Sequence, residues 1–181
     1  VFQDALLLPH RTVLDNVAFG PKMRGIGWKG LDTRELFFDD GWVADEHLSG
    51  DPAMGLSQFL STLDNGRIGL AALSLGIAEG ALEECLAYVG TRKQFGRHIA
   101  SYQGVHFAVS DMATEVEAAK HLVYHAAWLK QHGHPHKKEA AMAKLYASEL
   151  AMRATIKAVQ LHGGYGYTTE YPVERMMRDA K

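Results

Sequence analysis

The stretch GLSQFLSTLDNGRIGLAALSLGIAEGALEECLAYVGTR, from Gly55 to Arg92, decides the fold of this chain. Its apolar residues return every three or four positions, which is the period of one helix face. It predicts a single helix that is roughly 55 Å long at 1.5 Å per residue. The residues expected to face inward are Leu56, Phe59, Leu60, Leu63, Leu70, Leu73, Ile77, Leu82, Leu86 and Val89.

Three more helices are predicted downstream. One runs from about Gln103 to Gln131 and is broken by Gly133 and Pro135. An alanine-rich helix follows from Lys137 to Leu161, and a last one begins near Pro172, which suits a first helical turn. In the second helix the inward residues are expected to be Val105, Val109, Met112, Val116, Ala119, Val123, Ala126 and Ala127.

Long helices joined by short loops pack antiparallel to their sequence neighbours. The predicted fold is therefore mainly α, an up-down antiparallel helical bundle over residues 53–181 that is incomplete. Residues 28–52 carry β signals around Leu36-Phe37-Phe38 and end in turn formers at 49–52. We expect one or two short strands there, which are too few for a stable sheet.

Composition narrows the function classes. The chain has 181 residues, a formal charge of −2 and one cysteine, Cys85. This charge gives no support for nucleic-acid binding, and no polybasic patch suggests a membrane surface. No apolar run is long enough to insert into a bilayer. A single, buried and inert cysteine fits a reducing compartment, so we expect a cytoplasmic location, or the mitochondrial matrix in a eukaryote. The start at Val1 and the end at Lys181 suggest a partial gene product.

Thr91-Arg92-Lys93-Gln94-Phe95-Gly96-Arg97 is the first candidate binding segment. It is predicted to be a helix end that runs into a tight turn, with cations, an amide, an aromatic ring and a glycine close together. Such a cluster suits a phosphate that lies beside a ring. The alternative is a solvated basic helix terminus, where cations complement the helix dipole.

Gln160-Leu161-His162-Gly163-Gly164-Tyr165-Gly166-Tyr167 is the second candidate. A glycine pair at a helix end lets the backbone approach a ligand closely, and its amides can face a phosphate. The alternative is a plain helix cap followed by a tight turn.

Metal and hydrolase sites find little support. His121 and His125 have the spacing of metal ligands on one helix face, and His132, His134 and His136 share a loop. No third ligand is marked, so surface histidines are the better interpretation and we expect no metal site. No Ser–His–Asp or Cys–His arrangement appears either.

Seven motifs follow one another along the chain: DTREL at 32–36, FDD at 38–40, LDNGRI at 63–68, TRKQFG at 91–96, QLHGGYG at 160–166, YPVER at 171–175 and MRDAK at 177–181. In this order and spacing they resemble the acyl-CoA dehydrogenase family over about residues 28–181. The resemblance implies that residues 28–52 are the end of a middle β-domain and that residues 53–181 are a C-terminal helical domain. It also implies FAD as cofactor, acyl-CoA thioesters as substrates, and α,β-dehydrogenation with the flavin as hydride acceptor. An electron-transfer flavoprotein as partner and a homodimer or homotetramer are implied as well.

The same resemblance assigns site residues. Those implied to contact FAD are Arg92, Gln94, Phe95, Tyr102, Gln103, Gln160, Gly163 and Gly164. Among them, Arg92, Gln94 and Phe95 would reach the FAD of a neighbouring subunit, with Arg92 at the pyrophosphate, where the fork of a guanidinium suits phosphate. Asp64 and Arg67 match positions that meet the acyl-CoA chain.

The catalytic base is the point of departure from the family. Its glutamate is implied to lie beyond Lys181 or, in a minority of members, at the position that Gly66 occupies here. Glycine cannot take a proton, so residues 1–181 carry neither base and we expect the isolated chain to be inactive. The alternative is a non-enzymatic helical module that serves oligomerisation.

Residues 1–27 read differently from the rest. The strings VFQ, LLP and TVLDNVAFG resemble the Q-loop region of ABC-transporter ATPases, with Gln3 at the magnesium-sensing position. No G-x-x-x-x-G-K-[ST] phosphate loop occurs in the chain. We therefore expect a remnant that is not a folded domain by itself.

Overall fold

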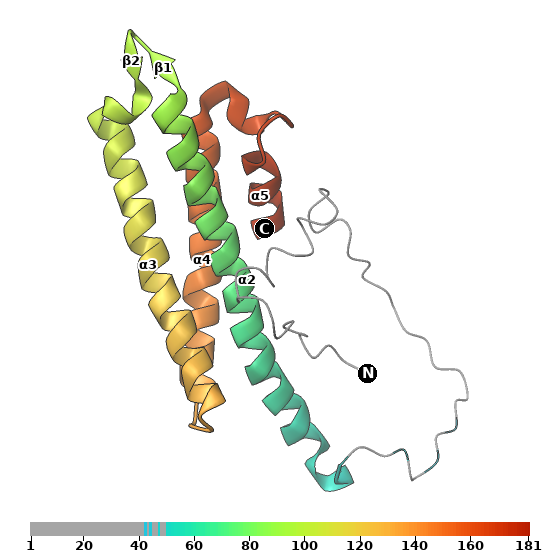
Figure 1. Cartoon of the computed structure of the whole chain (residues 1–181). Helices are drawn as coiled ribbons and strands as arrows, with labels where there is room; N and C mark the ends of the chain where they lie inside the picture. Colours follow the sequence, from blue (N-terminus) through green and yellow to red (C-terminus); the bar gives the residue numbers. More distant parts are fainter. Residues whose placement is uncertain (1–41, 43, 45–46, 48–49) are drawn as a thin grey trace.

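The computed structural model describes residues 42, 44, 47 and 50–181. Its helices form a bundle with a small hairpin at one end (Figure 1). The elements, in chain order, are η3 (Pro52–Met54), α2 (Gly55–Thr91), β1 (Lys93–Gln94), β2 (Arg97–His98), η4 (Ile99–Ser101), α3 (Gln103–Gln131), α4 (Lys137–His162), η5 (Gly163–Tyr167) and α5 (Val173–Ala180). The η elements are short 3₁₀ helices.

The helix ends follow the sequence signals closely, and the predicted mainly α up-down bundle is confirmed. The Asp51 carboxylate accepts a hydrogen bond from the Ala53 backbone N–H at 2.9 Å, just before α2 begins. Gly133, with φ +69°, ends α3, and Gly163, with φ +59°, ends α4. The pairing of β1 with β2 was not predicted, because two-residue strands leave no periodic pattern.

The up-down-up order makes α2 and α4 parallel to one another, with α3 antiparallel to both (Figure 1). Helix α4 makes its most extensive contacts with α2, and the short α5 packs on α4 and α2. Parallel packing places the carboxyl ends of α2 and α4 at the same end of the bundle.

Alanine dominates the core between the helices. Leu75, Val123 and Leu150 are among the few large side chains that are fully buried. Small side chains let helix backbones approach closely, so the core is held by many close dispersion contacts between backbones and alanines rather than by a few large side chains. The fully buried alanines are Ala71, Ala78, Ala81, Ala119, Ala126, Ala140, Ala143, Ala147 and Ala158.

The inward face predicted for α2 is largely wrong, whereas the one predicted for α3 is confirmed apart from the half-buried Val105 and Ala127. Helix α2 turns most of its alanines, with Ile68, Leu75 and Cys85, toward the core. Both faces of α2 are apolar, and the small-residue face packs more closely against α4. The predicted positions that are exposed instead are Leu56, Phe59, Leu60, Leu63, Leu70 and Leu86.

Two ionisable groups lie inside α2. Cys85 is fully buried, which raises the pKa of its thiol to about 12 and makes it the inert thiol that was predicted. Glu79 is nearly buried, with one carboxylate oxygen 3.8 Å from the Lys120 ammonium on α3. Burial raises the pKa of Glu79, and the nearby Lys120 lowers it by a smaller amount.

The segment 1–27 and most of the strands expected within 28–52 lie outside the described residues. In the part of the chain that the structure describes, no helix combines the length and the apolar character needed to span a bilayer.

The close packing of the alanine core leads to a testable prediction. Replacing Ala147, which is fully buried, with Leu should lower the free energy of unfolding by about 1–3 kcal/mol, because the core has no room for the added methyl groups. Ala141, an exposed residue of the same helix, is the matched control, and A141L should change stability by less than about 0.5 kcal/mol. Chemical denaturation of both variants measures the difference, and equal stabilities would contradict the packing described.

Candidate functional site

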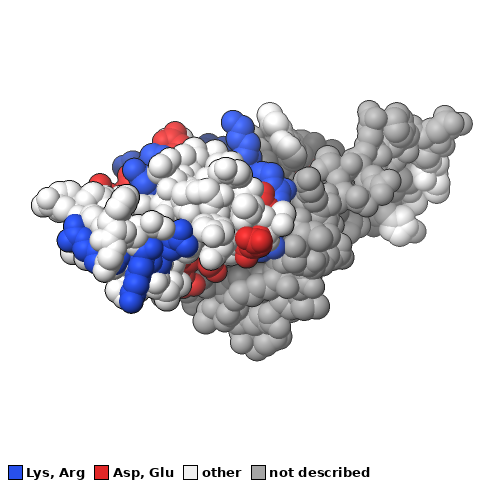
Figure 2. All heavy atoms as spheres, turned by 90° about the horizontal axis from the view of Figure 1, so that it is seen from above, with Lys and Arg blue, Asp and Glu red and all other residues white. Residues whose placement is uncertain are grey.

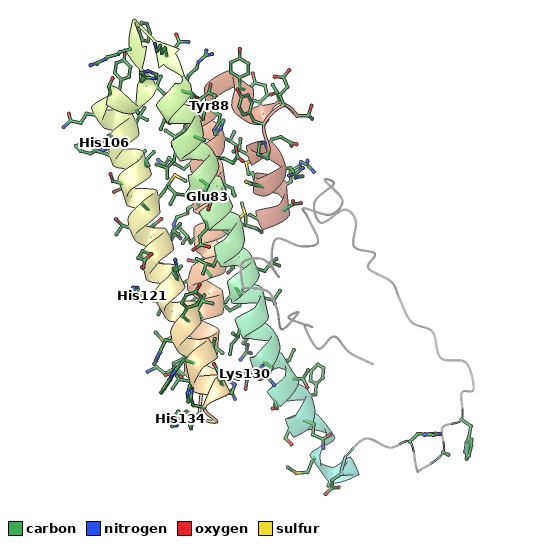
Figure 3. All side chains as sticks on the ribbon, in the orientation of Figure 1. Glu83, Tyr88, His106, His121, Lys130 and His134 are labelled. Atoms are coloured by element: carbon green, nitrogen blue, oxygen red, sulfur yellow. The ribbon has the colours of Figure 1, made fainter. Side chains whose placement is uncertain are left out.

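The carboxyl ends of α2 and α4 form a pocket with the base of the hairpin. Figure 3 labels Tyr88, which lies near the end of α2 on the side toward α4. No acidic residue lines this surface. Its lining residues, which we call the end pocket, are Tyr88, Arg92, Gln94, Ile99, Gln160, Leu161, His162, Gly163, Gly164 and Tyr165.

The hairpin projects beyond the end of the bundle (Figure 1), and we call its residues 93–98 the arm. Lys93 pairs with His98 and Gln94 with Arg97 in an antiparallel ladder. All six residues of the arm are exposed. Figure 2, which looks down on this end, shows Lys and Arg side chains on the surface on the side of the arm. The side chains of the arm are therefore accessible to another molecule at this end of the bundle.

The turn of the arm holds a strained aromatic residue. Phe95 has φ +51° and Gly96 has φ +82°, the pair of positive angles that a type I′ turn requires. Asn or Asp normally takes the first of these positions, and a left-handed bulky residue costs about 1–2 kcal/mol. Phe95 is nevertheless 92% exposed. The chain buries little of this ring, so strain and exposure together point to contact with another molecule.

Arg92 is held at the junction of α2 and the arm. Its N–H donates to the Tyr88 carbonyl at 2.8 Å, and its carbonyl accepts from the Ile99 N–H at 2.9 Å. Its guanidinium lies over the Tyr165 ring, 5.1 Å from the centroid. No carboxylate among the described residues pairs with it. Arg92 is therefore a fixed cation in the end pocket whose donors are free for an anion.

The glycine turn after α4 forms the opposite wall. Gly163 has φ +59° and ψ −134°, a conformation that only glycine adopts without strain. A Cβ at Gly163 or Gly164 would meet nothing within 4 Å, so the space in front of both is open. A Cβ at Gly166 would collide with the Val159 carbonyl, because the turn folds back on α4 there. The turn therefore exposes bare backbone to the pocket.

Aromatic packing joins the two walls. The rings of Tyr88 and His162 stack with centroids 4.2 Å apart, and Tyr171 meets both edge-on. The Tyr88 hydroxyl donates to the His162 carbonyl at 3.2 Å. Burial raises the pKa of Tyr88. Sequence reasoning missed Tyr88, although it lies one helical turn before Arg92 and so on the same face.

The structure brings most of the predicted cofactor residues to this one end. Arg92, Gln94, Gln160, Gly163 and Gly164 line the end pocket. Phe95 lies at the tip of the arm, and Tyr102 and Gln103 lie at the start of α3 beside it.

The predicted substrate residues lie elsewhere. Arg67 and Asp64 are on α2, with Arg67 about 37 Å from Arg92 at the helical rise. They form an ion pair with each other at 2.6 Å. A Cβ at the adjacent Gly66 would meet nothing within 4 Å. One chain therefore does not bring its substrate pair to its own end pocket.

The histidines that were considered as metal ligands, at 121, 125, 132, 134 and 136, are exposed or half-buried. His132 and His134 pack against Trp128 with centroids 4.3 and 5.6 Å away. His121 lies 3.4 Å from a Glu117 carboxylate oxygen. Within the described residues, no three His, Cys, Asp or Glu side chains gather as they would around a metal ion.

These features define a helical-bundle domain that presents a cation, an aromatic ring and open backbone at one end, a surface suited to an anionic ligand that contains a ring. Residues 53–181 match the family described as acyl-CoA dehydrogenase, C-terminal domain, and the chain belongs to that family.

Relatives and solved structures agree with this assignment. The chain is 53% identical over 156 residues to a probable acyl-CoA dehydrogenase, YngJ, of Bacillus subtilis, covering 86% of this chain and 41% of that protein. It superposes on butyryl-CoA dehydrogenase from Megasphaera elsdenii with a TM-score of 0.71 and 50% identity, over 72% of this chain and 34% of that one. A chain from a study of the electron transferring flavoprotein of Acidaminococcus fermentans gives a TM-score of 0.78 and 53% identity, over 79% and 38%. The chain thus spans less than half the length of these proteins.

Two glycines of the turn should respond differently to a methyl group. Gly166→Ala should lower the free energy of unfolding by about 1–3 kcal/mol, because the new Cβ meets the Val159 backbone. Gly164→Ala should leave stability within about 0.5 kcal/mol, since its surroundings are open and its φ is not positive. Thermal and chemical unfolding of both variants test this difference. A stable Gly166→Ala variant would show that the turn does not fold back as described.

Proposed function

We propose that this chain is the cofactor-binding C-terminal part of an acyl-CoA dehydrogenase, which carries out α,β-dehydrogenation of acyl-CoA thioesters with FAD as hydride acceptor. The observation that carries the proposal is the end pocket, where Arg92, which has no carboxylate partner among the described residues, faces a bare glycine turn. The exposed Phe95 lies at the tip of the adjoining arm. Family membership supports it. When bound, the flavin supplies the hydride chemistry, and the protein supplies binding and orientation.

Each group of the end pocket has a role that its chemistry fits. Arg92 faces the pyrophosphate, because a planar guanidinium without a carboxylate partner binds phosphate oxygens in a bidentate manner. Gly163 and Gly164 let the backbone come close to the same dinucleotide. Gln94 and Gln160 offer side-chain amides that can both donate and accept hydrogen bonds.

The arm reaches the FAD of a neighbouring subunit rather than one held by its own chain. Phe95 is 92% exposed, so its own chain leaves the ring open to contact with a second subunit. Arg67 and Asp64, which we assign to the acyl-CoA chain, lie about 37 and about 42 Å along α2 from Arg92 and so cannot share its flavin. Tyr102 and Gln103 lie at the adenosine end of the cofactor.

The catalytic base lies outside residues 1–181 in this proposal. Gly66 occupies the alternative position and has no proton acceptor, so we place the glutamate beyond Lys181. The α-proton of the thioester would be removed there, while the β-hydrogen leaves as hydride. Residues 1–181 then contribute binding and orientation alone.

The proposed partners are acyl-CoA, an electron-transfer flavoprotein and further copies of the same chain, in a dimer or tetramer. The name of the related butyryl-CoA dehydrogenase supports the substrate class. The related chain from the electron transferring flavoprotein study supports the electron acceptor. The bacterial relatives support a cytoplasmic location.

A second candidate is a helical module that serves only oligomerisation. The exposed row of Leu56, Phe59, Leu60 and Leu63 on α2 favours it, since such apolar surface is typical of protein contacts. It does not explain why Arg92 and Phe95 are held at the other end of the same helix. We therefore prefer the cofactor-binding function.

Replacing Arg92 with Ala in the full-length gene product separates the two functions. Flavin affinity should fall about 10- to 100-fold, because one charge-assisted interaction with the pyrophosphate is lost. Flavin absorbance retained after gel filtration, and titration with FAD, measure the loss. Arg153→Ala is the control, since Arg153 pairs with Glu115 and Glu149 away from the pocket. Unchanged flavin retention with altered assembly would favour the oligomerisation module.

Phe95→Asn should show that the ring is kept for binding rather than for stability. Asn is favoured at this left-handed position, so the free energy of unfolding should rise by about 1 kcal/mol. Flavin affinity should fall severalfold, because the aromatic contact is lost. Denaturation and FAD titration of the same variant test both effects. Phe95→Tyr keeps the ring and the strain, and should change neither. A variant that gains stability without losing affinity would remove Phe95 from the site.

A further inference from the structure

The arm is too small to hold its own shape. Each strand has two residues, and an isolated hairpin of this kind is marginally stable at best. The left-handed Phe95 weakens it further. Flavin binding as proposed needs Gln94 and Phe95 in one fixed arrangement, so something outside the ladder has to support them.

Tyr102 provides that support from a rigid base. Its carbonyl accepts the N–H groups of Val105 and His106, both at 3.0 Å, and so belongs to the first turn of α3. From this anchored position its hydroxyl donates to the Gln94 carbonyl, on strand β1 of the arm, at 3.0 Å. Its ring also meets Phe95 edge-on, with centroids 6.5 Å apart.

Arg97 completes the support. Its guanidinium lies over the Tyr102 ring, 4.0 Å from the centroid, which is closer than Arg92 to Tyr165 or Arg153 to Tyr146. A guanidinium at this distance stacks on the ring and gains from its negative face. Tyr102 therefore contacts both strands of the arm, Gln94 through its hydroxyl and Arg97 through its ring.

We infer that Tyr102 and Arg97 are positioning residues, which hold the arm in the conformation that meets the flavin, a role that Tyr102 has in addition to its place at the adenosine end of the cofactor. The effect on flavin binding rests on the proposed function, whereas the support of the arm rests on the contacts of Tyr102. Arg97 thus has a role in addition to the role of Arg92. For Tyr102, support of the arm becomes the main contribution.

Four variants of the full-length gene product test this pair. Tyr102→Phe removes only the hydroxyl and should weaken FAD binding about fivefold, the effect of one hydrogen bond. Tyr102→Leu removes ring and hydroxyl and should weaken it about tenfold or more, whereas Arg97→Leu should cost about threefold. The double variant should match Tyr102→Leu within about twofold, because Arg97 acts through the ring that is already absent.

Hydrogen exchange supplies a readout that does not depend on flavin. The amides of residues 94–98 should exchange about three- to tenfold faster in Tyr102→Leu, without FAD present, while the rest of the bundle keeps its rates. Tyr146→Leu is the matched control, since it removes a tyrosine beneath Arg153 on α4 and should leave the arm and the flavin affinity unchanged.

The outcomes separate the inference from the proposed function. Additive losses for Tyr102→Leu and Arg97→Leu would mean that Arg97 contacts the flavin directly, and would overturn the positioning role. Unchanged exchange of residues 94–98 would overturn it as well. If Arg92→Ala lowers flavin affinity and the Tyr102 variants do not, the inference fails and the proposed function stands. If Arg92→Ala also has no effect, the proposed function fails, and faster exchange would support only the structural role of Tyr102.

Discussion

The packing of α2 against α4 is the constraint on which the rest of the structure depends. The two helices run parallel, and α4 contributes a row of fully buried alanines to the core that it shares with α2. Parallel helices in close contact bring their carboxyl ends to one place. Arg92, which follows α2, and the Gly163–Gly164 turn, which follows α4, therefore face one another across the end pocket. The stack of Tyr88 on His162 fixes their separation.

This arrangement creates an electrostatic problem for a phosphate ligand. Each helix carries partial negative charge at its carboxyl end, and two such ends converge here. A phosphate would be repelled unless fixed positive charge offset both. Arg92 lies at the end of α2 without a carboxylate partner among the described residues, and Lys93 and Arg97 lie on the arm. In the proposed function, these clustered basic residues offset both helix ends and attract the phosphate.

The sequence predicted the helices well and their faces less well. The carboxyl-terminal ends of α3 and α4 follow from Gly133 and Gly163, because glycines in the left-handed conformation end helices by a local rule. The inward face of α2 was mistaken because both of its faces are apolar, and periodicity does not tell which one α4 covers. The convergence of Gln94 with Gln160 came from motif resemblance, whereas Tyr88, His162 and the support of the arm by Tyr102 needed the three-dimensional packing.

In the proposed function, Arg92 and the arm of one subunit bind the flavin of another. A structure of the full-length gene product with FAD bound tests this most directly, through the distance from the Arg92 guanidinium to the pyrophosphate oxygens. We expect hydrogen-bond contact with an FAD whose remaining contacts come mainly from a different chain, and Phe95 against the same cofactor. An FAD held by the same chain that supplies Arg92, or an Arg92 in contact with no phosphate, would contradict it.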